Sequence, residues 1–182
     1  MTTSKSFIFN KKFFQYGALV IILCFLVLMQ TALFGHLAVY STQLNLIFIA
    51  VFLLSFFESP TDEAEKKSKG FAVPAGVIGG FLLDIFSSLP FGTFTFTFLL
   101  LSFLVKKSHV FFHKSNKLAF LIAFLFSFLF YKICFAILAM LLVLVFEGRL
   151  SFIWPIKLLA LIELLYNFVI AGLIFLFFRL KT

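Results

Sequence analysis

The sequence predicts an all-α polytopic membrane protein with six transmembrane helices. Of its 182 residues, 63% are hydrophobic and only 12% are charged, whereas soluble domains are roughly half apolar. The mean hydropathy is +1.18. Because each crossing of a bilayer needs about 20 apolar residues, helices occupy nearly the whole chain, and we expect one transmembrane domain over residues 1–182. No room is left for a soluble catalytic domain.

The apolar runs define the expected helices in chain order. The six expected spans are about 17–36, 40–57, 71–87, 90–105, 118–146 and 152–180. The first is too long, and lacks the small-residue cleavage pattern, for a removed signal peptide. The second ends at Glu58, where the strongly polar stretch ESPTDEAEKKSKG begins. This stretch predicts a solvated loop.

The third and fourth runs predict a helical hairpin. Pro90 and Gly92 lie between the two runs and provide residues typical of a turn. Each run is near the lower length limit for a full crossing, so a re-entrant hairpin is the alternative. We favour two full crossings, and the loop charges lie on the same sides in either arrangement.

The basic residues predict the orientation. Three lie in the N-terminal tail, three in the loop at 58–69, four in the loop at 106–117 and two in the C-terminal tail, whereas the opposite side has Arg149. By the positive-inside rule, both termini and both polar loops are in the cytoplasm. The net charge of +8 therefore comes from basic residues at the membrane boundaries, where they set the topology and contact anionic lipid. It does not indicate nucleic-acid binding.

One acidic residue interrupts the hairpin. Ala72, Gly76, Gly80 and Asp84 follow one another at four-residue intervals, so a helix would align them on one face. Small residues let another helix backbone approach closely, and a carboxylate at bilayer depth costs at least a few kcal/mol without a partner. The face either packs against the protein's own helices or receives the transmembrane helix of a partner.

Other polar residues within the expected spans suggest a second cluster. These residues are Lys132, Glu163, Asn167 and Gln30. Asn45 in the second span is expected, like Gln30, to form hydrogen bonds between helices. Lys132 is expected at a depth similar to that of Asp84, so an ion pair between them is possible. The cluster is either a buried polar network that fixes helix register or part of a substrate or proton pathway.

Catalytic and metal-binding motifs are missing from the sequence. It contains no HExxH, GxSxG or P-loop, and an intramembrane aspartyl enzyme would need a second aspartate in a span. His109 and His113 have helical spacing, but no acidic residue accompanies them. Cys24 and Cys134 lie in apolar runs and form no CxxC. We therefore expect no enzymatic activity, no metal and no cofactor.

The hairpin resembles one family. The stretch from Gly76 to Gly92, GVIGGFLLDIFSSLPFG, is similar to the glycine-rich helix, Leu-Asp pair, serine-containing turn and following glycine of the rod-shape-determining membrane protein MreD family. Gln30 near the end of the first span, Asn45 and the last-span Asn167 are weaker matches. The proline that accompanies the second-span signature in the family is absent beside Asn45.

The resemblance implies a non-enzymatic component of the machinery for lateral cell-wall elongation in the bacterial inner membrane. Its implied partner is the bitopic protein MreC and, through it, the actin-like MreB filament, the glycosyltransferase RodA and a class B penicillin-binding transpeptidase. The partner surface would include Ala72, Gly76, Gly80, Asp84 and Gly92.

At fold level the family resembles the six-helix substrate-binding S-components of energy-coupling-factor vitamin transporters. An alternative function is therefore a small-molecule binding subunit of a transporter. In that case Asp84, Lys132, Glu163 and Asn167 would line a pocket near the membrane midplane.

Overall fold

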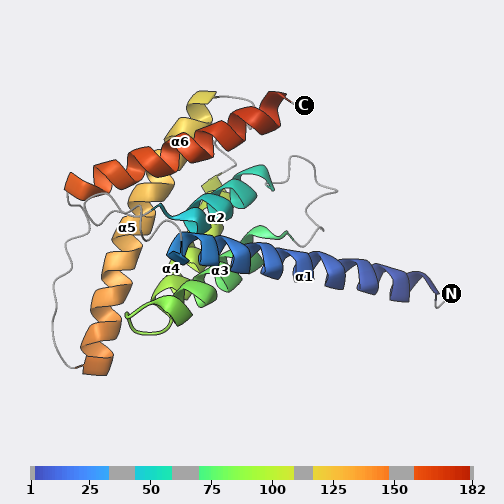
Figure 1. Ribbon diagram of the computed structural model, residues 1–182, viewed down its shortest axis with the longest axis horizontal. Helices are drawn as coiled ribbons and strands as arrows, with labels where there is room; N and C mark the ends of the chain where they lie inside the picture. The colour runs from blue at the N-terminus through green and yellow to red at the C-terminus, as the bar shows by residue number, and fades with distance from the viewer. Residues whose placement is uncertain (1–2, 33–43, 59–69, 109–116, 148–157, 181–182) are drawn as a thin grey trace.

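All the regular secondary structure in the described part of the chain is α-helical (Figure 1). The computed structural model describes residues 3–32, 44–58, 70–108, 117–147 and 158–180. The helices in these ranges are α1 (Thr3–Ala32), α2 (Leu46–Phe57), α3 (Ala72–Phe86), α4 (Thr93–Ser108), α5 (Lys117–Glu147) and α6 (Leu158–Leu180). The prediction of an all-α chain is therefore confirmed over the described ranges.

The helices follow the predicted order but differ from the expected spans in length. Three of them contain an apolar segment long enough to cross a membrane, namely Phe13–Ala32, Lys117–Phe146 and Ala160–Phe178. Helix α2 has 12 residues, which is about 18 Å at ~1.5 Å per residue and less than the ~30 Å hydrocarbon core. The loops at 59–69 and 109–116, with His109 and His113, and the segment 148–157, with Arg149, lie outside the described residues.

Helix α2 forms the centre of the core because it is apolar on every side. Phe48 and Phe52 are completely buried, and both meet Phe124 of α5 edge to face, with ring centroids 5.6 and 5.2 Å apart. Further along, Phe120 stacks on Phe175 of α6 at 4.2 Å. Aromatic pairs of this kind stabilise a fold by more than the area they bury would predict. The abundant phenylalanine therefore provides the packing between α2, α5 and α6.

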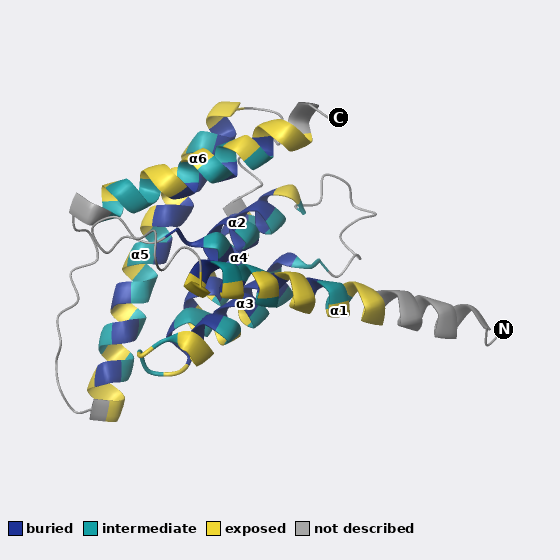
Figure 2. Ribbon diagram, viewed as in Figure 1, coloured by how far each residue is buried: buried dark blue, intermediate teal, exposed yellow. Residues whose placement is uncertain are grey.

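The outer surface of the described helices is strongly apolar. Exposed and buried residues alternate along α5 and α6 in Figure 2, and α1 extends away from the other helices. Phe14 and Ile21 on α1 and Leu173 on α6 are each more than half exposed. Apolar surface on this scale is typical of helices that face lipid or another membrane helix.

Candidate functional site

Asp84 caps the beginning of α4. Its carboxylate accepts the backbone N–H of Phe94 at 2.9 Å, the N–H of Thr95 at 3.0 Å and the hydroxyl of Thr95 at 2.6 Å. The side chain is 4% exposed. The first turn of a helix has N–H groups without intrahelical acceptors and a partial positive charge, so it stabilises a carboxylate at this position.

The turn between α3 and α4 brings the carboxylate to its donors. Gly92 has a φ of +101°, a conformation that side chains disfavour. Thr93 donates its hydroxyl to the carbonyl of Pro90 at 2.7 Å, and Ser87 accepts the N–H of Leu89 at 3.0 Å. Gly92 therefore acts here through the turn rather than through helix contact.

The glycine face of α3 is occupied by α4. A Cβ added to Gly76 would lie 2.7 Å from the backbone oxygen of Phe98, and one added to Gly80 would lie 2.6 Å from Cα of Thr95. Gly79, on a neighbouring face, would meet Ile47 of α2 at 2.8 Å. The glycine face was expected either to pack against the protein's own helices or to receive a partner helix. In the structure it packs against the protein's own helices.

Glu58 caps α3 in the same way that Asp84 caps α4. It follows the last residue of α2, and its two carboxylate oxygens accept the N–H groups of Phe71 and Ala72. Ala72, expected on the glycine face, is buried beside this contact. From the sequence, Glu58 is only the start of a solvated loop, because nothing in the local pattern indicates a contact 13 residues further on.

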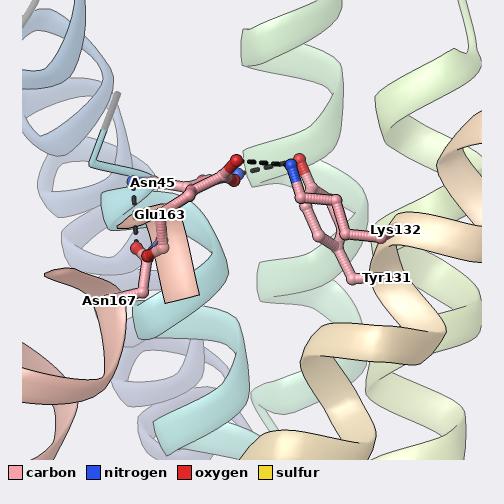
Figure 3. Close-up of polar contacts among 5 residues, drawn as sticks. All are labelled: Asn45, Tyr131, Lys132, Glu163 and Asn167. Carbon is pink, nitrogen blue, oxygen red and sulfur yellow. Dashed lines mark hydrogen bonds and ion pairs between the residues drawn. The ribbon is translucent and has the colours of Figure 1, made fainter. Parts of the chain in front are cut away.

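A second polar cluster joins four helices at Asn45, and Figure 3 shows the part of it formed by Asn45 and the residues of α5 and α6. Asn45 donates its backbone N–H to Oδ1 of Asn167 at 3.0 Å and its Nδ2 to the hydroxyl of Tyr131 at 2.9 Å. Its own Oδ1 accepts the N–H of Phe48 at 2.9 Å, which caps α2. Gln30 of α1 accepts the N–H of the next residue, Leu46, at 2.9 Å. We call these residues, with Lys132 and Glu163, the Asn45 junction.

Lys132 and Glu163 extend the Asn45 junction between α5 and α6. The Lys132 ammonium lies 2.5 Å from Oε2 of Glu163 and 5.6 Å from the ring centroids of Phe128 and Tyr131. Asn167 donates Nδ2 to the backbone oxygen of Glu163 at 2.8 Å. The ion pair considered between Asp84 and Lys132 does not form. Lys132 pairs with Glu163, and Asp84 accepts N–H groups of α4. Tyr131 was missed, since a tyrosine in an apolar run resembles an ordinary core residue.

The comparison with known families bears on this geometry. The family described as rod shape-determining protein MreD matches residues 64–181, well over half of the chain. The chain belongs to the MreD family. No curated protein and no solved structure matches it. The resemblance seen in the sequence is thus confirmed, and the chain is a rod-shape-determining membrane protein.

The match to MreD covers α3 to α6, and with them Asp84, Lys132, Glu163 and Asn167. These four side chains do not surround one cavity. Asp84 binds the first turn of α4, and the other three meet at the Asn45 junction. The arrangement therefore joins helices to one another.

The chemistry available at these sites is hydrogen bonding between helices. Among the described residues, no group of three His, Cys, Asp or Glu side chains is placed to hold a metal ion. Buried polar side chains in the described ranges have partners, with Ser55 Oγ the exception. In an apolar environment such contacts fix the register of neighbouring helices, because an unpaired polar group there is costly.

Proposed function

We propose that this protein is a non-enzymatic scaffold of the bacterial cell-wall elongation complex. It binds an MreC-like bitopic partner through its transmembrane helices. Through that partner it reaches an MreB-like filament, a RodA-like glycosyltransferase and a class B penicillin-binding transpeptidase. The observation that carries the proposal is membership of the MreD family. The use of its polar side chains as contacts between helices supports a scaffold over a catalyst.

The proposal includes a topology of six crossings in the inner membrane, with both termini in the cytoplasm. The distribution of Lys and Arg along the chain supports this orientation. The short helices α2 and α3 adjoin segments outside the described residues. The proposal also includes a fold similar to that of the six-helix energy-coupling-factor S-components. This part of the proposal is based on the resemblance of the MreD family to them.

We propose that the partner helix docks on α1 and not on the glycine face of α3. Gly76 and Gly80 already contact α4, so no second helix fits there without displacing it. On α1, three buried apolar residues face the core, namely Leu19, Leu23 and Val27. The opposite side exposes Phe14 and Ile21, and between them a Cβ added to Gly17 would have no atom within 4 Å. A small residue between large exposed ones gives a partner helix a place for close approach.

The test is co-purification of the MreC-like partner with two matched variants. Gly17→Leu fills the open position on α1, and Gly172→Leu fills an equally open position on α6. We expect Gly17→Leu to reduce partner recovery at least about tenfold, and Gly172→Leu to leave it unchanged. Loss of recovery only with Gly172→Leu would place the partner on α6 instead. Full recovery with both variants would contradict docking on either face.

A further inference from the structure

An open apolar groove lies between the beginning of α5 and the last turns of α6. Its volume is about 400 Å³, and its walls include Phe120 and Leu121 from one helix and Phe168, Gly172 and Leu176 from the other. A Cβ added to Gly172 would have no atom within 4 Å. The missing side chain at this position therefore leaves part of the groove free.

A lysine lies at one end of the groove. Lys117, an exposed residue in the first turn of α5, is part of the lining, and because this lining is almost entirely apolar, the lysine contributes its hydrocarbon stem to it. An anionic group at this end would lie within reach of the Lys117 ammonium, while an apolar chain continued along the groove.

We propose that this groove is a binding site for one anionic phospholipid. One acyl chain lies between α5 and α6 over Gly172, and the phosphate lies beside Lys117. The volume falls in the range of about 300–1,000 Å³ that is usual for small-ligand sites. An α-helix is about 10–12 Å across, so a groove of this volume accepts a hydrocarbon chain more readily than a partner helix.

The experiment is native mass spectrometry of the full-length protein in detergent, with phosphatidylglycerol or phosphatidylcholine added as the probe. We expect a one-to-one adduct with phosphatidylglycerol. Gly172→Leu should weaken this adduct at least about tenfold. Lys117→Gln should weaken it about fivefold, which corresponds to ~1 kcal/mol for a basic residue near anionic lipid.

Matched controls separate the groove from the rest of the surface. Gly17→Leu changes an equally open glycine on α1, and Lys107→Gln changes an exposed lysine outside the groove lining. Both should bind phosphatidylglycerol like the original protein. Unchanged binding by Gly172→Leu, or equal adducts with phosphatidylcholine, would overturn the proposal. A cross-link between Gly172→Cys and the partner's transmembrane helix would also overturn it.

The two proposals fail separately. If the lipid proposal is wrong, Gly172→Leu leaves the lipid adduct intact. Partner recovery with Gly17→Leu then still tests docking on α1. If the docking proposal is wrong, Gly17→Leu leaves partner recovery intact, and the lipid adduct still reports on the groove.

Discussion

A single carboxylate, Asp84, satisfies three donors at the start of α4. Its sequence context correctly indicates that a buried acid needs a partner, but not that the partner is the backbone. A lysine on another helix is the more obvious candidate from the sequence, because charges are visible in a sequence and free N–H groups are not.

Replacing Asp84 tests its role as a cap. In Asp84→Ala the N–H groups of Phe94 and Thr95 lose their acceptor, and we expect a loss of about 1–3 kcal/mol of stability. Asp84→Asn keeps one acceptor oxygen and should lose less. Thermal unfolding in detergent, followed by circular dichroism, measures both. An Asp84→Ala protein that unfolds at the original temperature would show that the cap contributes nothing.

Gly80 provides a second test at the scale of one residue. A methyl group there would overlap the backbone of α4, so Gly80→Ala must move the two helices apart at a cost of about 1–3 kcal/mol. Gly17→Ala is the matched control, because its Cβ enters open space. The same unfolding assay should show a lower transition temperature for Gly80→Ala alone. Equal stability of the two variants would contradict close packing of α3 on α4.

At the scale of elements, α2 is a short helix whose beginning is held by other helices. Gln30 of α1 and Asn167 of α6 accept N–H groups at its first residues, and Asn45 supplies its own cap. These acceptors replace the water that would satisfy a helix end at a protein surface. The start of α2 is therefore stable only when α1 and α6 are in place.

Asn45→Ala tests this dependence. The change removes the cap on Phe48 and the contact with Tyr131, so we expect faster hydrogen exchange at residues 46–49 and a loss of about 1–2 kcal/mol. Thr31→Ala is a suitable control, because the Thr31 hydroxyl bonds to carbonyls of its own helix. Unchanged exchange at the start of α2 would show that the other helices hold it without Asn45.

At the scale of the whole molecule, local patterns predicted the helices, and distant contacts determined how they meet. The hairpin of α3 and α4 was predictable, since two apolar runs flank a Pro-Gly turn. Four members of the Asn45 junction, Gln30, Lys132, Glu163 and Asn167, could be selected as a polar network because polar side chains are conspicuous in apolar runs, whereas Tyr131 could not. Their partners were not predictable, because Asn45 and Asn167 are 122 residues apart. The short length of α2 was also missed, as hydropathy alone extends the run to residue 40.

The ion pair of Lys132 and Glu163 joins α5 to α6 and is mostly buried. Lys132→Met leaves the Glu163 carboxylate without its partner, and we expect a loss of about 3 kcal/mol. Glu163→Met should cost a similar amount, and the double variant should recover much of the loss, because neither charge is then buried alone. Unfolding temperatures of the four proteins complete the cycle. Additive losses in the double variant would contradict a direct interaction.

Glu58 and Asp84 give the chain a directional order of assembly. Each acid belongs to the end of one helix and binds the start of the next, so each contact needs only residues that have just been synthesised. We expect α2, α3 and α4 to lock together one after another as the ribosome delivers them. The Asn45 junction, which needs α5 and α6, closes last and completes the folded protein.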